Sequence, residues 1–329
     1  MVHVAARAGV SLKTVSRVVN AEPGVAESTA ALVQAAIDEL GFRRNEGASH
    51  LRRGSTTASL GLVLMDVADP FYSTLTRAVE EVALRHRFLV LAGSSDEDMA
   101  RERELALSLC SRRVDGLLVV PAGTDQTYLE PEIRAGTPVV FVDRPGAGVD
   151  ADVVLVDNAG GTRAAVEHLA ARGHRQIAFL GDNPAIYTAR ERQRGYRDGM
   201  AAIGRRPDER LIAMGPHSPL SVAAALERLR GGARPVTALV TGNNRITVMV
   251  LRALAAGRRW RPALVGFDDL ELADLLRPGV TVIEQDASGL GRSAAELLFS
   301  RIAGDRRPAQ KIVLPTRLIE RGSGETRPS

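Results

Sequence analysis

The sequence contains one cysteine, two lysines and no long apolar run. Because Cys110 has no second cysteine to pair with, an intramolecular disulfide is excluded, and its apolar helical surroundings predict a small buried side chain instead of a reactive thiol. No uninterrupted apolar segment approaches the ~18 residues that a membrane span needs. The first residues also lack the pattern of a secretory signal peptide. These absences together predict a cytoplasmic protein without a membrane partner.

Length and charge set broad limits on the class of protein. The 329 residues are enough for two or three domains, and 45% hydrophobic with 25% charged residues is ordinary for a soluble globular protein. The formal net charge is +4, and residues 1–54 contain seven Lys/Arg against five Asp/Glu. The basic excess is therefore denser near the N-terminus, which permits nucleic acid as a partner without requiring it.

Residues 5–20 have the pattern of two short helices joined by a tight turn. Gly9 can adopt a positive φ at the corner, and the Ser11 hydroxyl can cap the second helix. Val15 and Val18 fall on the inward face of that helix. Its outer face then carries Leu12, Lys13, Thr14, Ser16 and Arg17. Such a face at a helix N-terminus suits the phosphates and base edges of DNA, although an ordinary helical hairpin has the same outline.

Two further helices are predicted before residue 58. One runs from Glu27 to Leu40, is opened by Ser28 or Glu27, and is closed by Gly41. The other lies within residues 44–54 and is short, polar and basic. It has too little apolar surface to be stable alone.

From residue 58 onward, compact apolar runs alternate with amphipathic helical stretches. The runs are Leu60–Val67, Phe88–Ala92, Gly116–Val120, Val139–Val142, Val153–Val156, Ile177–Leu180, Ala238–Val240 and Leu264–Phe267. Strands that are apolar on both faces and alternate with helices predict parallel sheets covered on both sides. The length of this part suits two α/β lobes, with crossovers near residues 156–161 and 284–286. Ligands bind such a body in the cleft at the carboxyl ends of its strands.

A family resemblance joins these two parts of the chain. The run Val-Ala-Ala-Arg-Ala-Gly-Val-Ser-Leu-Lys-Thr-Val-Ser-Arg-Val-Val-Asn, at residues 4–20, resembles the signature of the lactose-repressor/galactose-repressor (LacI/GalR) family of bacterial transcription factors. Segments of the body resemble further landmarks of that family. They are Pro70–Tyr72, Val142–Arg144, Asp157–Asn158, His168–Gly181, Gly266–Asp269 and Leu314–Leu318. The resemblance covers nearly the whole chain.

The resemblance implies an α/β fold in which a helix-turn-helix headpiece precedes a two-lobed, periplasmic-binding-protein-like effector domain. We expect the headpiece at residues 1–43, a hinge helix and linker at 44–57, and the effector-binding and dimerisation domain at 58–329. We expect lobe 1 at about 58–157 and 287–314, and lobe 2 at about 158–286 and 315–323.

The same resemblance assigns DNA contacts to the second helix of the headpiece. Leu12 and Lys13 occupy the positions that contact the operator in related repressors. Lys13 can donate to guanine O6 and N7, which discriminates between bases by roughly 1–3 kcal/mol, and Leu12 can touch a thymine methyl group. Thr14, Ser16 and Arg17 match positions that contact phosphates or bases.

In the hinge, Leu51 matches a leucine that related repressors insert into the minor groove, with Asn45 and Ala48 in register. An apolar wedge of this kind kinks the DNA at a cost of a few kcal/mol, which wider contact offsets. The alternative is that Leu51 packs against the effector domain.

The resemblance also points to an effector site between the lobes. Arg192 stands three residues before Gly195, where the family places an effector-binding arginine, and Asp268 and Asn243 stand at strand ends. Arginine donates and aspartate accepts, so the two can hold vicinal hydroxyls. Asp143 is a weaker candidate, and Phe71 or Tyr72 can cover an apolar ring face. The alternative for each polar residue is a structural hydrogen bond within or between the lobes.

Three other patterns carry no predicted function. His168 and His174 are six residues apart, do not share a helical face and have no expected cysteine or acidic partner nearby, so we predict no metal site. The segment Gly289-Leu-Gly291-Arg-Ser-Ala294 matches a dinucleotide loop formally, but it lies late in the chain and is interpreted as a small-residue helix start, without a cofactor. Asn244 replaces the aspartate usual in the family, and the segment between Pro262 and Gly266 is shorter than usual.

The sequence therefore predicts a homodimeric, cytoplasmic transcriptional repressor. Its partners are double-stranded operator DNA and a small sugar-like effector bound between the lobes. An enzyme on this body would need a nucleophile–base pair or a cofactor loop, and neither is recognisable. The alternative is a periplasmic-type sugar-binding protein without DNA function, which would need a signal peptide and would not carry residues 5–20.

Overall fold

The computed structural model describes residues 1–20, 22–42, 57–231, 234–257 and 260–328. The chain divides into two units, Met1–Thr57 and Ala58–Ser329. In the part of the chain that is described, no helix has both the length and the apolar character to cross a membrane.

The described residues of the N-terminal unit form three short helices. α1 spans Val2–Ala8, α2 spans Leu12–Val19 and α3 spans Glu27–Glu39. Gly9 ends α1 with a φ of 66°, a left-handed conformation that favours glycine. The Ser11 hydroxyl caps α2 by accepting a hydrogen bond from the backbone N–H three residues later, at 3.1 Å. The helix–turn–helix expected for this segment is therefore present.

A small apolar core holds the three helices together. Val15 of α2 and Val33 of α3 are fully buried, and Val4 and Ala36 are nearly so. Val18 is partly buried against this cluster. The inward face predicted for the second helix is thus confirmed, and burial of each such side chain contributes about 1.5–3 kcal/mol.

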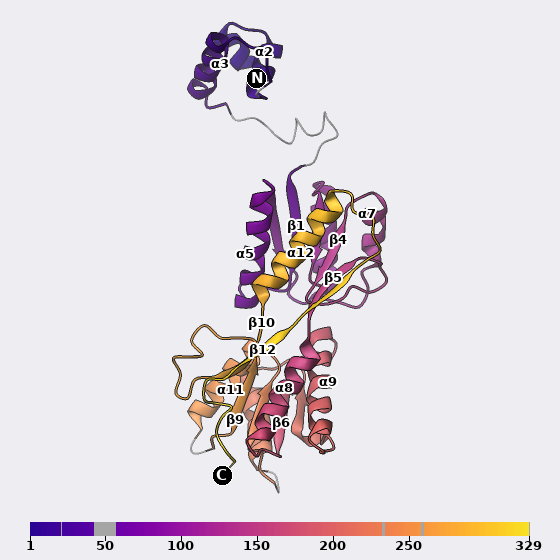
Figure 1. The fold of residues 1–329 in the computed structure, drawn as a ribbon, viewed down its shortest axis with the longest axis vertical. Helices are drawn as coiled ribbons and strands as arrows, with labels where there is room; N and C mark the ends of the chain where they lie inside the picture. The colour runs from indigo at the N-terminus through magenta and orange to yellow at the C-terminus, as the bar shows by residue number, and fades with distance from the viewer. Residues whose placement is uncertain (21, 43–56, 232–233, 258–259, 329) are drawn as a thin grey trace. The chain divides into compact units, whose positions relative to one another are not determined.

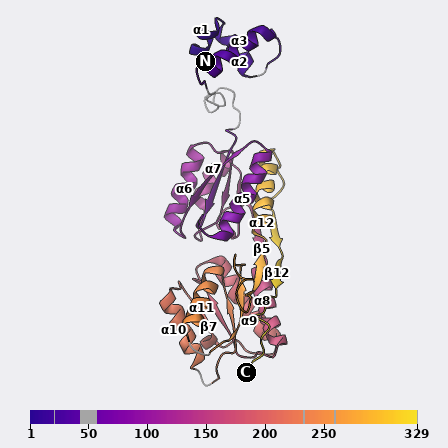
Figure 2. The ribbon, with the colours of Figure 1, turned by 90° about the vertical axis from the view of Figure 1, so that its left-hand side faces the viewer.

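Lobe 1 of the second unit is a six-stranded parallel sheet with the strand order β11-β5-β4-β3-β1-β2 (Figure 1). Its strands are β1 (Ser59–Leu64), β2 (Leu89–Ser94), β3 (Gly116–Val119), β4 (Val139–Val142), β5 (Asp152–Val156) and β11 (Lys311–Leu314). Its helices are α5 (Pro70–Arg85), α6 (Met99–Ser111), the short η1 (Thr127–Leu129), α7 (Glu130–Arg134) and α12 (Ala287–Ile302). Figure 2 shows α6 on one side of this sheet and α5 with α12 on the other.

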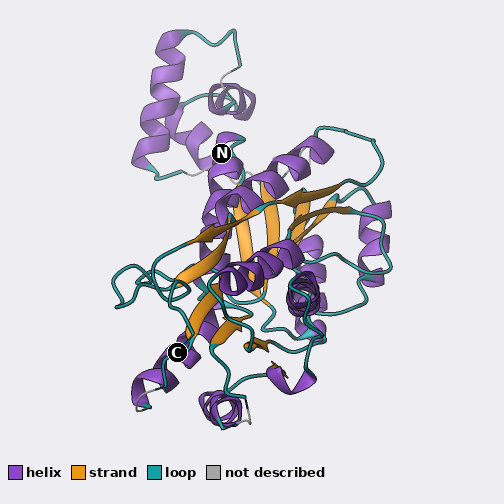
Figure 3. Ribbon diagram, turned by 60° about the horizontal axis from the view of Figure 1, so that its bottom comes forward, coloured by secondary structure: helices purple, strands orange, loops and turns teal. Residues whose placement is uncertain are grey.

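Lobe 2 is a second six-stranded sheet with the order β12-β10-β9-β8-β6-β7, parallel except that β12 runs antiparallel to β10. Its strands are β6 (Ile177–Gly181), β7 (Ile212–Met214), β8 (Ala238–Thr241), β9 (Ala263–Phe267), β10 (Thr281–Gln285) and β12 (Thr316–Ile319). Its helices are α8 (Asn158–Ala171), α9 (Tyr187–Ala202), the short η2 (Glu209–Leu211), α10 (Pro219–Arg230) and α11 (Asn244–Ala256). Strands lie inside and helices outside, as Figure 3 shows. The predicted α/β class with two largely parallel sheets is confirmed.

The chain passes between the lobes three times. It crosses from β5 to α8 at Asp157, from β10 to α12 at Asp286, and from β11 to β12 at Pro315. Each aspartate caps the helix that follows it: Asp157 accepts from Gly160 N–H at 2.8 Å, and Asp286 from Gly289 N–H at 2.7 Å. The same capping pattern therefore opens the first helix after each of these two crossings.

Side chains of the strands alternate between two apolar layers. In β1, Leu60, Leu62 and Leu64 pack in the layer that contains α5 and α12, whereas Val63 packs in the layer with α6. Cys110 is buried in this second layer, and burial raises the pKa of its thiol to about 11. The expectation of a small buried residue at this position is confirmed.

Glycines let two pairs of helices approach closely. A Cβ on Gly291 of α12 would collide with the Leu75 carbonyl of α5, and a Cβ on Gly195 of α9 would collide with the Ala159 carbonyl of α8. The small residues at the start of α12 therefore serve helix capping and packing.

Four of the strands lie outside the predicted runs: β7, β10, β11 and β12. β7 has three residues, none fully buried, and alternate residues of β11 are exposed. Short or half-exposed strands of this kind give no continuous apolar signal. The predicted run Leu60–Val67 is too long, because β1 ends at Leu64 and Asp69 caps α5 with Pro70 in its first turn.

Candidate functional site

The first candidate surface is the N-terminal turn of α2 in the headpiece. Leu12 is 50% exposed and Lys13 is exposed, while Thr14 is half-buried with its Oγ1 2.9 Å from the Ser11 Oγ. Leu12 and Lys13 therefore point into solvent at the end of the helix where backbone N–H groups and the helix dipole favour anions.

The other predicted DNA contacts of α2 have partners inside the headpiece. Arg17 donates to the Pro23 carbonyl, and its Nε lies 3.9 Å from a Glu22 carboxylate oxygen. Ser16 Oγ accepts from Asn20 Nδ2 at 3.4 Å. One end of the Arg17 guanidinium is therefore held within the headpiece, while the side chain stays partly exposed. The hinge predictions Asn45, Ala48 and Leu51 lie outside the described residues.

The second candidate site lies between the lobes, at the carboxyl ends of β4 and β9. Asp143 directly follows β4 and Asp268 directly follows β9, and both have left-handed backbones, with φ of 67° and 68°. Each donates its N–H to the neighbouring strand, Asp143 to Val154 and Asp268 to Ile283, both at 2.9 Å. Equivalent turns in the two lobes thus position one carboxylate each, even though the segment before Asp268 is short for the family.

Tyr72 and Arg144 surround Asp143 on the lobe 1 side. The buried Tyr72 hydroxyl donates to Asp143 Oδ2 at 3.3 Å, and Arg144 Nε lies 3.5 Å from the same oxygen. Arg144 also donates to both carboxylate oxygens of Glu97, at 2.6 and 2.7 Å, and to the Pro121 carbonyl at 3.0 Å. Asp143 Oδ1 is buried and has no hydrogen-bond partner among the described residues.

Arg192 of α9 occupies the centre of the lobe 2 side. Its Nε donates to Asn158 Oδ1 and its Nη1 to the Gly242 carbonyl, both at 2.7 Å. Its Nη1 lies 3.6 Å from Asp268 Oδ2, and its guanidinium stacks 3.9 Å from the centre of the Phe267 ring. Four interactions therefore fix one buried cation in a single orientation.

Adjacent asparagines divide two tasks at the start of α11. Asn243 caps the helix by accepting from Ile246 N–H at 2.8 Å, and it donates to Asp182 Oδ2 at 2.8 Å. Both of its polar groups are thus used inside lobe 2. Asn244 is buried and reaches lobe 1, where its Nδ2 lies 3.1 Å from Asp69 Oδ1. The contact that joins the lobes here comes from Asn244, one residue beyond the position singled out from the sequence.

Burial dominates the electrostatics of the two cleft carboxylates. It raises the pKa of Asp143, partly offset by Arg144 and Arg192, and it raises the pKa of Asp268, partly offset by Arg192. Burial also raises the pKa of Tyr72, and the nearby Asp143 carboxylate raises it further. Because Arg192 of lobe 2 acts on Asp143 of lobe 1, the candidate residues of the two lobes face each other across the cleft.

A groove of about 960 Å³ opens the cleft to solvent beside Asp268. Phe71 of lobe 1 lines it together with Gln285, which donates to Asp268 Oδ1. The Phe71 ring lies edge-on to the Tyr72 ring with centres 5.0 Å apart. Phe71 therefore forms part of the groove wall, whereas Tyr72 is enclosed.

The structure thus brings together Tyr72, Asp143, Arg192 and Asp268, with Phe71 at the groove and Asn243 turned to structural use. Sequence reasoning missed Asp69, Asn158, Asn244 and Gln285. Asn158 and Gln285 lie within the predicted crossovers at residues 156–161 and 284–286, and this position is the signal that could have identified them. Asp69 and Asn244 could have been found only as a pair, because each is a normal residue for a helix start.

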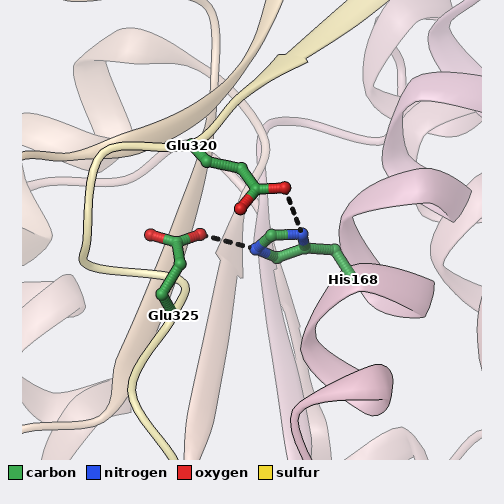
Figure 4. A group of neighbouring side chains, drawn as sticks. All are labelled: His168, Glu320 and Glu325. Atoms are coloured by element: carbon green, nitrogen blue, oxygen red, sulfur yellow. Dashed lines mark hydrogen bonds and ion pairs between the residues drawn. The ribbon is translucent and has the colours of Figure 1, made fainter.

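Acidic residues surround His168, contrary to expectation (Figure 4). Glu325 Oε1 lies 2.7 Å from its Nε2, and Glu320 Oε1 lies 3.8 Å from its Nδ1. These partners were missed because they lie some 150 positions further along the chain. Arg172 enters the same group, with Nη1 3.1 Å from His168 Nδ1 and Nη2 2.8 Å from Glu320. Arg172 thus supplies a positive charge beside the two carboxylates, and the cluster joins the C-terminal segment to α8.

Both the headpiece and the two-lobed body are similar to known proteins. Residues 1–45 match the family model for bacterial regulatory proteins of the lacI family, and residues 166–324 match the periplasmic binding protein-like domain. The HTH-type transcriptional regulator CelR of Thermobifida fusca is 34% identical over 334 residues, which cover 98% of this chain and 97% of CelR.

Solved structures extend the likeness to the three-dimensional fold. The complex of the transcriptional regulator CelR with cellobiose is 31% identical, with a TM-score of 0.73 over 98% of each chain. The lac repressor dimer bound to operator and the anti-inducer ONPF is 26% identical, with a TM-score of 0.84 over 98% of each chain. The chain therefore belongs to the LacI family of bacterial regulatory proteins.

Proposed function

We propose that this regulator is a homodimeric repressor whose affinity for operator DNA is controlled by a sugar-like effector bound between its lobes. The observation that carries the proposal is the pair of carboxylates, Asp143 and Asp268, that the two lobes turn toward one buried arginine. A ligand held by both lobes changes their relative orientation, and its coupling to DNA binding is expected to be about 1–3 kcal/mol.

The DNA surface of the proposal is the exposed start of α2. Lys13 and Leu12 are free to enter a major groove, and Thr14, Ser16 and Arg17 lie along the same helix. We assign base contacts to the first two residues and phosphate contacts to the others. Two headpieces of a symmetric dimer would occupy the two half-sites of a near-palindromic operator, with Asn45, Ala48 and Leu51 contacting the minor groove between them.

The effector site comprises Asp143, Arg192 and Asp268, with Phe71 and Tyr72 at its apolar side. Carboxylates accept and a guanidinium donates, which is the combination that holds neighbouring hydroxyl groups. The solved complex of the relative CelR contains cellobiose, which favours a sugar here as well. The polar groups of Asn243 are occupied within lobe 2, so we assign this residue a structural role. Asn244 is the asparagine that contacts lobe 1.

The dimer surface we propose lies along the edge strand β2 of lobe 1. Leu84, Leu89, Leu91 and Met99 are large apolar residues that are 40–75% exposed. Exposed apolar surface of this kind is typical of a protein interface. A second copy of the chain is the proposed partner, as in the solved dimer of the lac repressor.

The proposed role is regulatory and not catalytic, and the protein acts in the cytoplasm, where operator DNA is found. A gel shift with the DNA upstream of its own gene tests the proposal, first without ligand and then with a panel of sugars. We expect a shifted band at low salt that one sugar abolishes or strengthens. Absence of any shift at low salt, with or without sugars, would refute the proposed function.

A further inference from the structure

Two buried acceptors of the cleft lack hydrogen-bond donors. Asp143 Oδ1 and Gln285 Oε1 have no partner among the described residues, and the two residues are only 3% and 8% exposed. The buried donor Arg144 Nε also lacks a hydrogen-bond partner there, but it lies 3.5 Å from Asp143 Oδ2 and is attracted to that carboxylate. A buried polar atom without a partner is costly, so a ligand that brings hydrogen-bond donors would relieve both atoms. Hydroxyl groups supply such donors, whereas ionised phosphate and carboxylate groups supply only acceptors.

Carboxylates outnumber cations inside the cleft. Three carboxylates lie close together here, because, in addition to burial, the charges of Asp143 and Asp69 raise the pKa of Asp268. The charge of Arg144 is already matched by Glu97 through two hydrogen bonds. That leaves Arg192, which is directed at Asp268 and at the carbonyl of Gly242. An anionic ligand would therefore meet a surplus of negative charge.

The groove that leads into the cleft also carries more negative than positive charge. Its carboxylates are Asp268, Asp269, Glu271, Asp274, Glu284 and Asp286. Its two cations are both paired: Arg321 with Asp269 at 2.6 and 2.7 Å, and Arg317 with Glu284 at 2.7 Å. With six carboxylates against two arginines, the groove has an excess of negative charge, which repels anionic ligands before they bind.

A second opening, of about 130 Å³, is smaller and contains Arg144 and Arg190. Arg190 donates to the carbonyls of Pro184 and Ala185, at 3.0 and 2.7 Å, and the charge of Arg144 is matched by Glu97. Arg190 keeps its positive charge, but this one arginine is outnumbered by the carboxylates of the main groove.

We propose that the cleft selects an uncharged, hydroxyl-rich ligand and rejects phosphorylated and carboxylated sugars. This inference rests on the proposed function, because it concerns the charge of the effector at that same site. Neutral sugars donate hydrogen bonds to the unpartnered acceptors. Their anionic derivatives bring like charge toward Asp143 and Asp268, through a groove that already repels them.

Calorimetric titration of the full chain with matched sugar pairs tests this selectivity. The probes are glucose against glucose 6-phosphate and gluconate, ribose against ribose 5-phosphate, and cellobiose against cellobionate. We expect at least one neutral sugar to bind, and to bind at least about a hundredfold more tightly than its anionic counterparts, which corresponds to about 2.7 kcal/mol. An anionic probe that binds as tightly as its neutral partner, or a panel in which no neutral sugar binds, overturns the inference.

Charge variants connect the selectivity to the cleft. Asp143→Asn and Asp268→Asn keep the side-chain shape and remove one charge. Each is therefore expected to reduce the ratio of the affinity for a neutral sugar to the affinity for its anion at least about tenfold. Asp198→Asn removes a charge from an exposed position on α9 and should leave this affinity ratio unchanged. If the wild-type protein and the three variants all have the same affinity ratio, these carboxylates do not set the selectivity. Two cleft variants are used because either alone could destabilise its lobe.

The gel shift without ligand separates failure of this inference from failure of the proposed function. Operator binding together with a preference for anions refutes the charge selectivity and leaves the regulator intact. If the protein does not bind operator DNA but calorimetry still shows tighter binding of neutral sugars, the proposed regulatory function is refuted and the proposed ligand class is not.

Discussion

Closure of the two lobes is predicted to depend on the hydrogen bond between Asn244 and Asp69. Asn244→Ala removes the Nδ2 donor that lies 3.1 Å from Asp69 Oδ1. Asp69 keeps the hydrogen bond from Phe71 N–H at 3.0 Å, so the cap of α5 survives. Within lobe 2 the variant also loses the hydrogen bond that Asn244 Oδ1 accepts from Arg245 N–H at 2.6 Å, a local loss of the kind that the control variant below shares. The remaining loss falls on the contact between the lobes.

The expected magnitude follows from the charge of the acceptor. A hydrogen bond to a charged group contributes about 1.5–3 kcal/mol, which changes the ratio of closed to open lobes by about 10- to 150-fold. A ligand that binds only the closed lobes loses affinity by the same factor. Asn244→Asp is predicted to be weaker still at neutral pH, because it places two carboxylates together. Sharing the site raises the pKa of one of them, so closure recovers as pH falls through that raised value.

Calorimetric titration at neutral and acidic pH, with a sugar that binds the wild-type protein, measures these effects. Asn183→Ala is the matched control, since that side chain accepts a hydrogen bond only from its own loop, at Ala185 N–H. The reasoning is refuted if Asn244→Ala binds as tightly as the control. It is also refuted if Asn244→Asp shows no gain in affinity on acidification.

Four further outcomes are expected. Lys13→Ala should weaken operator binding by about 1–3 kcal/mol in gel shifts and relax preference at one base pair; a loss that is uniform across DNA sequences would instead indicate a phosphate contact. Gly291→Ala should lower the free energy of unfolding by about 1–3 kcal/mol in denaturant titration, because its Cβ meets the Leu75 carbonyl. Burial raises the pKa of Asp143, so its protonated form is favoured in the folded state. Its contribution to stability should therefore grow as pH falls from neutrality toward about 4, and in thermal unfolding the difference between the wild-type protein and Asp143→Asn should change with pH accordingly. Leu89→Glu should convert the dimer to monomers in analytical ultracentrifugation, and an unchanged sedimentation coefficient would exclude β2 from the interface.

Local patterns were enough to predict the headpiece and most of the sheets. The turn at Gly9 and the cap at Ser11 depend on residues a few positions apart, so periodicity and capping rules describe them well. The buried strands β1, β3 to β6, β8 and β9 likewise appear in the sequence as continuous apolar runs, and so does the exposed edge strand β2, whose leucines are apolar in spite of their exposure. Edge strands such as β7 and β11 do not, because solvent covers part of their surface and polar residues are tolerated there.

Contacts between distant segments could not be derived in the same way. His168 and Glu325 are 157 positions apart, and no local rule brings them together. Asn243 and Asn244 are the same residue type at adjacent positions, so the sequence does not show which of them contacts Asp69. The direction in which each side chain points at the start of α11 decides this. Arg192 and Asp268 were identified through family resemblance, and the hydrogen bond from Arg17 to the Pro23 carbonyl was not foreseen.

The three crossings between the lobes have a consequence for synthesis of the protein on the ribosome. Lobe 1 needs β11 and α12, and lobe 2 needs β12, so neither sheet is complete until the last tenth of the chain has been made. At about 5–20 residues per second, the second unit takes roughly 15–55 s to emerge after the headpiece. A DNA-binding headpiece therefore leaves the ribosome well before the domain that controls it, and a chain that stops early carries the first without the second.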